Sequence, residues 1–594
     1  MIYLPPLRRF LLPSLILLAI ILIRRLHVNY LIALTSFRPY NTANHVEGIR
    51  IPYKDWKQHS LPIRDPSENH LSPPNHYFYT YDEDDLLGGD NASSTTAIWS
   101  KPALNPAMGM LFQCYASPNK YTNAIRLPNI LRNISMTVPG SLQKDNRIFW
   151  NPTIISLPYW SENQYLLVSR IITDGFYQEN VLCEANICYN SREYKRDGEL
   201  PCTEDDIEYL GGAGGLRCVT EPIPLRVPPT PAEHCEGRHQ FFSEIPGFHD
   251  PRIFWSGKGE PLMMVNTQSR YACFGLWLID LRTLHPPLAR LLSSDPTFPS
   301  LGPLMSYPTL TELTRNPAST RHNIEKNWCL FFSGSQSHIQ YEVSPQVRTF
   351  AKLIGNGFTT PNLTDPLERP CLQQNDTHDD DESRGGGEGG TWHQATNSLQ
   401  LVLCNRHDPR CKPSRNNTVF FAVVHRKFGN VLGLPMRYER YFIVWLATPP
   451  FSMLGVSRYP ILFRNETLSG WSAEENWDDD NSNNNHPQPP HLHSQIQTPN
   501  NSNMPNRPIP TYKNTTTHSH SHPQPQPPLW SPFTYTVSIS WAFGRPHDSP
   551  QTKNSGYLDD NVVVSIGVED EGQVVGIARA AELLVCLRGC LGRR

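Results

Sequence analysis

The sequence predicts an all-β protein in which many short strands form a barrel, a sandwich or a propeller. Three observations support this fold class. Short runs rich in β-branched and aromatic residues recur along the chain, and turn-forming residues bound most of them. Proline accounts for 56 of 594 residues, well above the ~5% of average proteins. Apolar residues at helical spacing are scarce, and residues 575–587 are one short helix candidate.

The strand candidates begin after residue 150 and continue almost to the C-terminal end. The cysteine-rich stretch between residues 183 and 235 lacks their pattern and is predicted to be loop-like. The candidates are residues 154–157, 165–172, 252–255, 262–266, 274–279, 329–332, 339–343, 401–404, 419–424, 440–446 and 561–568.

Composition divides the chain into segments. Low-complexity insertions at residues 376–390 and 472–529 contain too few apolar residues to form a packed core. We therefore expect one folded β region that is interrupted by the longer insertion. The predicted segments are a cytoplasmic tail and signal anchor at 1–34, a polar, proline-rich stem at 35–104, the folded region at 105–471, the insertion at 472–529 and the rest of the folded region at 530–594.

An uncharged apolar run at residues 10–23 is flanked by arginine pairs. As a helix it would rise ~21 Å, less than the ~30 Å hydrocarbon core of a membrane. Flanking arginines can snorkel, and residues 26–34 are also largely apolar. No small-residue cleavage site follows, which favours an anchor over a signal peptide, with a buried helix as a further alternative. The sequence therefore predicts a single-pass type II protein of the Golgi or another secretory-pathway membrane, with its folded part in the lumen.

Cysteines and glycosylation sequons fit that compartment. All thirteen cysteines lie outside the apolar run, and no C-x2-C pair is present, which disfavours a zinc site. Cys404 and Cys411 are predicted to staple a loop. The odd total leaves at least one thiol unpaired, and the other pairings stay open. The sequons are at Asn91, Asn133, Asn362, Asn375, Asn416, Asn465, Asn500 and Asn514.

Charge excludes some partners. The formal net charge is −3, so a broad basic surface for nucleic acid is not expected. The acidic runs at residues 82–85, 379–382 and 478–480 lie in polar segments away from the strand candidates, which disfavours a catalytic metal site. Gly211–Gly215 lacks the context of a phosphate-binding loop. We therefore predict neither a metal nor a cofactor.

The densest group of reactive residues is the segment Gly247-Phe-His-Asp-Pro-Arg-Ile-Phe-Trp255. Pro251 biases Asp250 toward an extended conformation, which would hold its carboxylate rigidly at the start of a strand as a general acid or base. Arg252 shares the strand face of Asp250, would keep it ionised, and is itself a candidate for binding substrate. The alternative is an ordinary Asp-Pro turn that begins a strand.

Two further segments carry groups that bind anions or sugar hydroxyls. Lys326 and Asn327 lie just before an apolar strand, for which a solvated loop is the alternative. His425 and Arg437 lie in two charged stretches, for which the edge of a charged strand is the alternative. Each segment alone leaves its function open.

Four short segments stand in a fixed order along the chain: Asn151-Pro-Thr-Ile with residues 165–170, then residues 247–253, 325–328 and 558–570. In this order they resemble motifs of the β-mannoside phosphorylase family. The stretch 183–235, residues 247–281 and residues 349–366 resemble more closely a divergent relative, the fungal β-mannosyltransferases. The resemblance covers about residues 105–470 and 530–586.

The resemblance implies a five-bladed β-propeller with its site on the central axis. The Asp of the Asp-Pro-Arg motif is the proton donor or acceptor in the phosphorylases, and it corresponds to Asp250. By motif position, Arg170, Lys326 and Asn327 would hold the phosphate or donor group. His249 stands where the phosphorylases commonly have an acidic residue. With the cysteine-rich stretch and the anchor, this departure favours glycosyl transfer over phosphorolysis.

The predicted function is inverting β-mannosyl transfer from GDP-mannose, as donor substrate, to mannan or another cell-wall or glycoprotein glycan. Asp250 would act as general base toward the acceptor hydroxyl. Arg170 and Lys326 would offset the charge of the nucleotide diphosphate. The acceptor linkage and the oligomeric state stay open.

Two other functions stay open as well. A β-mannoside phosphorylase or hydrolase would use the same carboxylate. A hydrolase of the inverting type needs a second carboxylate ~6.5–9.5 Å away, and Glu325 and Glu439 are candidates for it. The other alternative is a propeller that binds glycans through aromatic and amide side chains without catalysis.

Overall fold

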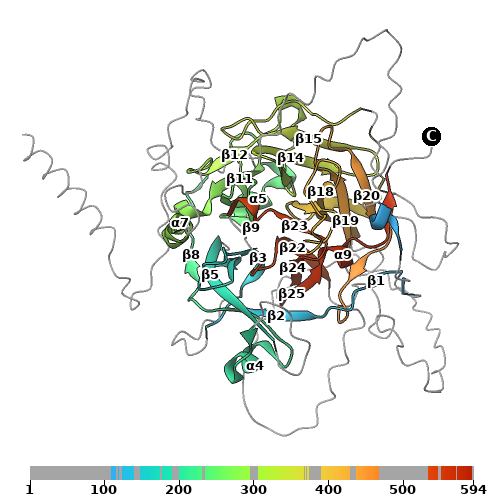
Figure 1. The fold of residues 1–594 in the computed structure, drawn as a ribbon. Coiled ribbons are helices and arrows are strands. Elements are labelled where there is room, and N and C mark those ends of the chain that lie inside the picture. Colours follow the sequence, from blue (N-terminus) through green and yellow to red (C-terminus); the bar gives the residue numbers. More distant parts are fainter. Residues whose placement is uncertain are drawn as a thin grey trace, which may run out of the picture. The chain divides into compact units, whose positions relative to one another are not determined.

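The computed structural model confirms a mostly β protein (Figure 1). The predicted anchor, stem and longer insertion lie outside the residues that it describes. The described part runs from residue 109 to residue 590, except for residues 115–117, 120–122, 139–147, 174–176, 190–199, 231–234, 295–304, 367, 369–370, 373–389, 429–435, 467–532, 546–549 and 570–571.

Most strands pair antiparallel in five successive groups. The first consists of β3 (Trp150–Ser156), β4 (Tyr165–Ile172) and β5 (Gln178–Tyr189), and the second of β9 (His249–Trp255), β10 (Pro261–Gln268), β11 (Phe274–Asp280) and β12 (Thr311–Leu313). The third consists of β13 (Cys329–Ser333), β14 (Gln336–Val343) and β15 (Arg348–Lys352). The fourth consists of β17 (Leu399–Val402), β18 (Thr418–Phe428), β19 (Arg437–Leu446) and β20 (Met453–Ser457), and the fifth of β22 (Thr534–Trp541), β24 (Asn561–Val568) and β25 (Gly572–Arg579).

Shorter elements extend or connect these groups. The additional strands are β1 (Ile125–Arg126), β2 (Leu131–Ser135), β6 (Leu200–Pro201), β7 (Gly214–Cys218), β8 (Ile223–Pro224), β16 (Thr391–Gln394), β21 (Ile461–Leu462), β23 (Ser555–Tyr557) and β26 (Leu587–Gly589). The helices are η2 (Met110–Phe112), α4 (Glu204–Leu210), η4 (Gly237–His239), α5 (Phe241–Glu244), α6 (Leu281–Leu284), α7 (Pro286–Ser293), η5 (Ala318–Thr320), η6 (Pro550–Thr552) and α9 (Ala580–Leu583).

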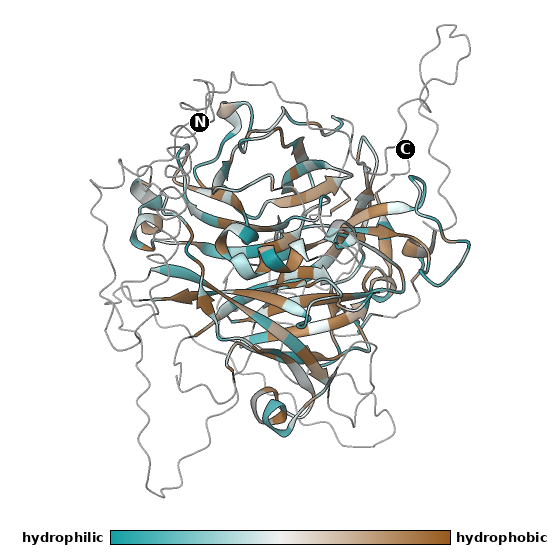
Figure 2. Cartoon of the chain, turned by 60° about the vertical axis from the view of Figure 1, so that its left-hand side comes forward, coloured by the Kyte–Doolittle hydropathy of each residue, from teal (hydrophilic) through white to brown (hydrophobic). Residues whose placement is uncertain are grey.

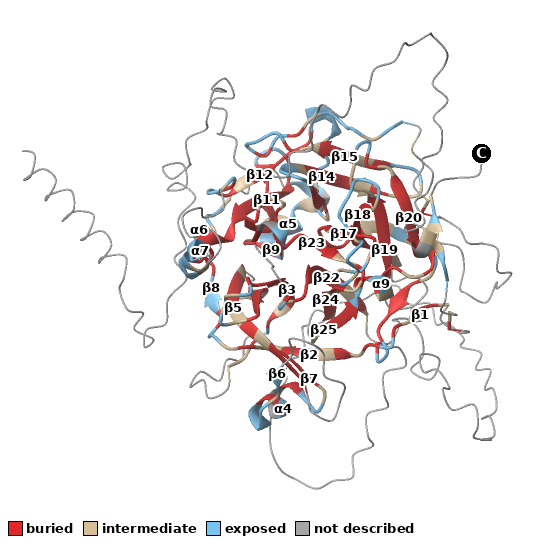
Figure 3. Cartoon of the chain, viewed as in Figure 1, coloured by how far each residue is buried: buried red, intermediate tan, exposed pale blue. Residues whose placement is uncertain are grey.

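The core is divided into layers, each between two neighbouring groups. One layer joins the first and second groups, and it includes Ile155 and Trp255. The next layers join the second to the third, the third to the fourth and the fourth to the fifth group. A last layer joins the fifth group back to the first, through residues such as Val563 and Leu167. Central strands are therefore buried on both faces, as Figure 3 shows, and hydrophobic residues are concentrated on the strands of the interior (Figure 2).

Strands at one edge of each group, or the segments next to them, also contact the corresponding strands of the two neighbouring groups. Side chains and backbone groups link them in a closed circle, so that one end of every group faces a common centre. The contacts, in order, are Ile253 N to Thr153 Oγ1 at 3.0 Å, Phe254 to Phe332 with ring centroids 6.1 Å apart, Ser398 Oγ to Leu330 O at 3.0 Å, Thr536 N to His425 Nε2 at 3.0 Å and Ile154 N to Ser538 Oγ at 3.0 Å.

The two ends of the described chain are joined. β2 pairs with β25 antiparallel and with β7 parallel, so an N-terminal strand connects the fifth group to the first. β1 pairs with β21, and a disulfide joins Cys114 to Cys586. The fifth group is therefore held to the start of the described chain by strand pairing, and the segment that follows β25 is held to it by a covalent bond.

The disulfides confirm two predictions. Cys404 and Cys411 are bonded and staple a loop, and Cys329 is a buried free thiol. The cysteine-rich stretch is not a loop throughout, because Cys183 and Cys188 lie on the twelve-residue strand β5. The other bonds are Cys183–Cys218, Cys188–Cys202, Cys235–Cys273 and Cys371–Cys590.

Two predictions are corrected. Residues 575–587 are not one helix: β25 occupies the first part, and only α9 is helical. β25 contains β-branched residues and pairs with β24 along all eight of its positions, and this pairing outweighs a weak helical pattern. The single-pass Golgi membrane location is also wrong, because no helix in the described part of the chain is long and apolar enough to span a membrane. The apolar run at 10–23 lies outside that part.

Candidate active site

Asp250 lies on a β-bulge near the start of β9. In the pairing with β10, Asp250 and Pro251 together face the single residue Val265. The backbone of Asp250 has a φ of 46°, so the predicted extended conformation is wrong. Aspartate tolerates this left-handed region better than most residues, and a bulge interrupts the ladder where Pro251 lacks an N–H. Bulges of this type re-aim a side chain and are frequent beside active sites.

The carboxylate of Asp250 meets the guanidinium of Arg170. The distance from Nη1 to Oδ1 is 3.2 Å, and the Asp250 side chain is 57% exposed against 11% for Arg170. Arg170 lies at the end of β4 opposite Trp150 and its guanidinium lies 4.8 Å from the centroid of that ring. The cation is thus held in place by the sheet, while the carboxylate stays open to solvent and to a ligand.

Arg252 adds a second cation beside Asp250. Its Nη2 atom donates to Asn327 Oδ1 at 3.3 Å. Its Nη1 atom is fully enclosed and has no hydrogen-bond partner among the described residues. Burial lowers the pKa of Arg252, and the nearby charge of Asp250 opposes that shift. A guanidinium held in this way favours an anionic ligand.

The fourth group contributes a pair of neutral histidines. His393 on β16 lies opposite His425 on β18, with ring centroids 5.6 Å apart. Burial lowers the pKa of His393 to about 4 and holds that of His425 well below its usual value. His425 Nε2 accepts a hydrogen bond from the backbone N–H of Thr536, which requires a neutral ring with its proton on Nδ1.

Two lysines complete the cationic side of this cluster. Lys326 is exposed, and Lys427 is half-buried at the end of β18. Burial, followed by the charge of Lys326, lowers the pKa of Lys427. After burial, the charges of Arg252 and of both lysines also lower the pKa of His393. The structure therefore brings Lys326 and Lys427 to the same cluster as Arg252.

The predicted residues Arg170, Asp250, Arg252, Asn327 and His425 thus lie in one cluster, with Lys326 at its edge. Each of the first four strand groups contributes to it, and every contribution comes from the same end of the sheets. Arg437 is not part of it. Arg437 on β19 lies opposite Phe428 on β18, and it shares a face of the sheet with Glu439. His425 lies on the other face of the same sheet.

Sequence reasoning missed His393 and Tyr535. Lys427 and Tyr438 lie in the two charged stretches that contain His425 and Arg437, but neither was predicted as a site residue. His393 follows a glycine-rich insertion, and its four-residue strand is too short for a periodic signal. Tyr535 lies on β22, whose sequence Thr-Tyr-Thr-Val-Ser-Ile-Ser-Trp alternates polar and apolar residues and carried a usable strand signal.

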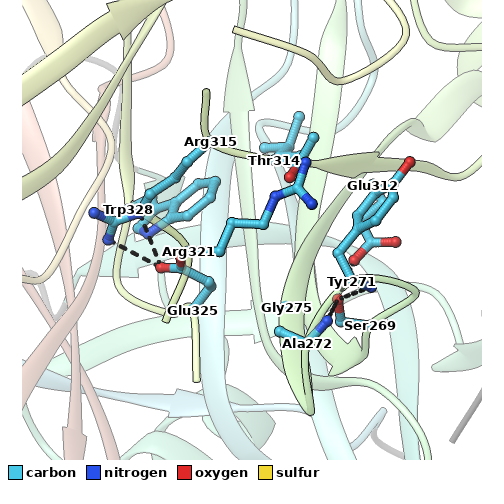
Figure 4. Close-up of a pocket in the computed structure, with 11 residues that line it drawn as sticks. Ser269, Tyr271, Ala272, Gly275, Glu312, Thr314, Arg315, Arg321, Glu325 and Trp328 are labelled. Carbon is cyan, nitrogen blue, oxygen red and sulfur yellow. Dashed lines mark hydrogen bonds and ion pairs between the residues drawn. The ribbon is translucent and has the colours of Figure 1, made fainter. Parts of the chain in front are cut away.

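A small pocket is lined by Glu325 and Trp328, which flank Lys326 and Asn327 in the sequence (Figure 4). It lies between the β10–β11 turn and the loop that leads to Lys326. Its acidic groups are already engaged: Glu312 accepts from Ser269 Oγ and Arg270 N, and Glu325 binds Arg315 with Oε2 2.9 Å from Nη2. The other candidate for a second carboxylate, Glu439, accepts from Tyr441 Oη at 2.8 Å on the far face of β19.

The predicted glycosylation sites are spread over the surface. Asn133, Asn362, Asn416 and Asn465 are exposed, and the other four sequons lie outside the described residues. The side chain of Asn465 already binds both backbone groups of Leu131, with Oδ1 2.6 Å from N and Nδ2 3.0 Å from O.

Comparisons with known proteins give weak matches only. No protein-family model and no curated protein sequence matches the chain, so no family match supports the expected relationship to β-mannosyltransferases. A β-1,2-mannobiose phosphorylase from Listeria innocua, solved with β-1,2-mannobiose, is 9% identical with a TM-score of 0.31, over 74% of this chain and 91% of that one. The catalytic domain of a GH62 α-L-arabinofuranosidase from Coprinopsis cinerea is 8% identical with a TM-score of 0.30, over 77% and 98%. An α-L-arabinofuranosidase from Podospora anserina, solved with cellotriose, is 9% identical with a TM-score of 0.29, over 77% and 99%. Scores this low establish neither a shared fold nor a shared activity.

Proposed function

We propose that the chain is a carbohydrate-active enzyme that moves a glycosyl group between a phosphate and a sugar hydroxyl. The observation that carries the proposal is a single exposed carboxylate, Asp250, among cations that have too few acidic partners. Arg170 pairs with it, and Arg252 is held close by through Asn327. Such a set suits a ligand that brings its own negative charge next to the bond that reacts.

We also infer a five-bladed propeller as the architecture behind this site. Five antiparallel groups, five core layers between them and a closed circle of contacts support that assignment. In a propeller, loops and strand ends of different blades meet at the central channel. Residues far apart in sequence, such as Arg170 and Lys427, then serve one site.

The reaction needs one proton-transfer group. In the direction of phosphorolysis, protonated Asp250 gives its proton to the glycosidic oxygen, and the bond from that oxygen to the anomeric carbon breaks. A phosphate oxygen held by the cations attacks the anomeric carbon from the opposite side and forms the new bond. The products are a free sugar and a glycosyl phosphate of inverted configuration. In the reverse direction Asp250 takes the proton from the attacking hydroxyl.

The sugar and the donor follow from the sequence resemblance, which points to β-mannosides. Phosphorolysis of a β-mannoside is the first candidate, because inorganic phosphate matches the compact pair of Arg170 and Arg252. Transfer from GDP-mannose is the second, because Lys326 and Lys427 extend the cationic side beyond what one phosphate needs. Hydrolysis is disfavoured, because Glu325 and Glu439 are engaged elsewhere.

The test is turnover by the purified protein with each substrate pair. One assay supplies β-linked mannobiose with inorganic phosphate, another GDP-mannose with a mannoside acceptor, and a third mannobiose in water alone. Asp250→Asn keeps a residue that tolerates positive φ, and we expect it to lower kcat by roughly 10²–10⁴-fold. Asp408→Asn, which alters a surface pair with Arg410, is the matched control and should keep full activity.

The outcomes separate the candidates. Release of mannose 1-phosphate supports phosphorolysis, and mannoside extension with release of GDP supports transfer. Release of mannose without phosphate, or full activity of Asp250→Asn, contradicts the proposal. Glycan binding without turnover in any of the assays would leave a binding protein.

A further inference from the structure

One side of the cluster is aromatic. Tyr438 on β19 and Tyr535 on β22 have ring centroids 5.8 Å apart, and Phe533 lies 5.9 Å from Tyr438 and 6.5 Å from Tyr535. The rings of Phe533 and Tyr535 are close to parallel, with an interplanar angle of 27°. All three side chains are half-buried rather than enclosed in the core. We call these three residues the aromatic patch.

The patch directly adjoins the cationic side. Lys427 Nζ lies 5.4 Å from the centroid of the Tyr438 ring, and that ring is 5.7 Å from His393 and 5.6 Å from His425. Tyr535 is near enough to Arg252 to affect its ionisation. The patch therefore borders the same space as the groups assigned to phosphate.

Tyr535 also lies next to the first strand group. Gly567 on β24 is opposite Tyr535, and a Cβ at this position would collide with the Asn151 side chain and make a tight contact with the Tyr535 ring. Asn151 lies on a bulge of β3 with a φ of 54°, one residue from Trp150. The patch thus closes the ring of groups between the Lys427 side and the Trp150–Arg170 side.

From this placement we propose that Tyr438, Phe533 and Tyr535 form a stacking subsite for a neutral sugar ring, which holds the second sugar of the substrate. This inference rests on the proposed function, because it names where the leaving or accepting sugar lies. A pyranose has one face of C–H groups, which packs on the negative face of an aromatic ring. Its hydroxyls point outward, where the neutral, partly exposed His393 can exchange hydrogen bonds with them.

The division of labour follows from charge. Arg170, Arg252 and the two lysines attract the phosphate, and they give a neutral sugar little electrostatic attraction. The aromatic patch has the reverse preference, because stacking needs surface area rather than charge. Substitutions of the cations should therefore lower the affinity for phosphate, and substitutions in the aromatic patch should lower the affinity for the sugar.

The experiment measures binding without relying on turnover. Binding of β-linked mannobiose to the full chain is followed by saturation-transfer NMR and calorimetry, in the presence and absence of inorganic phosphate. The variants are Tyr535→Ala, Phe533→Ala and the conservative Tyr535→Phe. The control is Tyr159→Ala, which alters an exposed tyrosine in the turn at the other end of the β3–β4 hairpin.

We expect Tyr535→Ala and Phe533→Ala each to weaken mannobiose binding about tenfold, which corresponds to ~1.4 kcal/mol, with phosphate affinity within about twofold of the parent. Tyr535→Phe and Tyr159→Ala should bind as the parent does. If Tyr535→Ala does not fold by near-UV circular dichroism, Phe533→Ala and the retained binding of Tyr535→Phe carry the test.

Three results would overturn the subsite. The first is no mannobiose binding to the parent at about 10 mM, roughly tenfold above a Kd of 1 mM. The second is an equal loss of phosphate and sugar affinity in Tyr535→Ala or Phe533→Ala, and the third is competition by guanosine, which would assign the patch to a nucleobase. Failure of the proposed function is recognised separately. A protein that binds mannobiose through Tyr535 but never turns it over keeps the subsite and loses the enzyme. A protein that turns over, with sugar binding unchanged by Tyr535→Ala, keeps the enzyme and loses the subsite.

Discussion

At the scale of single residues, burial keeps two histidines of the candidate site in their neutral form. His393 and His425 stay neutral beside four cations, so they supply hydrogen bonds without adding to the positive charge that Asp250 faces. Asp250 in turn is strained, with a left-handed backbone that costs an aspartate about 1 kcal/mol or more. Strain of this kind persists where the surroundings fix it, and it is concentrated at functional sites.

Another buried histidine, His338, makes stability depend on pH. Its ring stacks on Phe331 with centroids 4.9 Å apart, and burial, followed by the charge of Lys352, lowers its pKa to about 4 from 6.5. The unfolded chain then binds a proton at a higher pH than the folded one, so the stability is fully present above pH 6.5 and is lost as pH falls toward 4.

We therefore predict that His338→Gln reduces the loss of unfolding free energy between pH 6.5 and pH 4, as measured by urea denaturation at several pH values. His407→Gln, at a side chain that is 85% exposed, is the control and should leave the pH profile as it is. An unchanged pH profile in His338→Gln would contradict the assignment.

At the scale of elements, strands were predicted correctly where a run of β-branched or other hydrophobic residues is also buried in the structure. Residues 165–172 and 561–568 were predicted with the bounds of β4 and β24, because hydrophobic runs between turn residues leave little choice. β25 was mistaken for a helix, since Gly572 and Gly576 fit neither pattern well and only pairing with β24 decides. The site was predicted in part. Residues on motifs were found, and Lys427 lay in a charged stretch that was already a candidate, whereas Tyr535 reaches the site through strand pairing that no local pattern encodes.

A buried ion pair links β19 of the fourth group and β22 of the fifth group to the segment that follows β21. Arg440 on β19 holds Glu466 through two contacts of 2.8 Å, and both side chains are almost fully buried. Glu466 also accepts from Phe463 N and from Thr534 Oγ1 on β22. Its carboxylate therefore ties the end of β21 to both neighbouring strands.

We predict that Glu466→Ala lowers the free energy of unfolding by about 3–5 kcal/mol, because it leaves the buried Arg440 charge without an acidic partner. Chemical denaturation measures the change. Asp408→Ala, which removes the partner of Arg410 in a surface pair, is the control and should have no measurable effect. Similar stability of the two variants would mean that Arg440 finds other partners.

For the whole molecule, closure of the circle decides whether the site exists. Asp250 belongs to the second group and Lys427 to the fourth, and the circle that holds both groups is closed where the fifth group packs on the first. Besides that packing layer, the pairing of β2 with β25 and β7 links the fifth group to the first, and the bond between Cys114 and Cys586, which are 472 residues apart, ties the segment after β25 to the start of the described chain. Loss of this closure should loosen the fifth group, which carries Tyr535, before it affects the others.

We predict that Cys114→Ala/Cys586→Ala lowers the free energy of unfolding by roughly 2–5 kcal/mol and raises hydrogen exchange in β22, β24 and β25 ahead of β9 to β15. The unfolded chain gains more freedom when a long loop is released than when a short one is, although Cys371–Cys590 limits part of that gain. The matched control is Cys404→Ala/Cys411→Ala, which opens a bond between residues only seven apart and should cost less. Denaturation of the oxidised proteins and exchange mass spectrometry provide both measurements. An equal loss in the two variants, or exchange that rises uniformly, would show that the closure is held by strand pairing and packing alone.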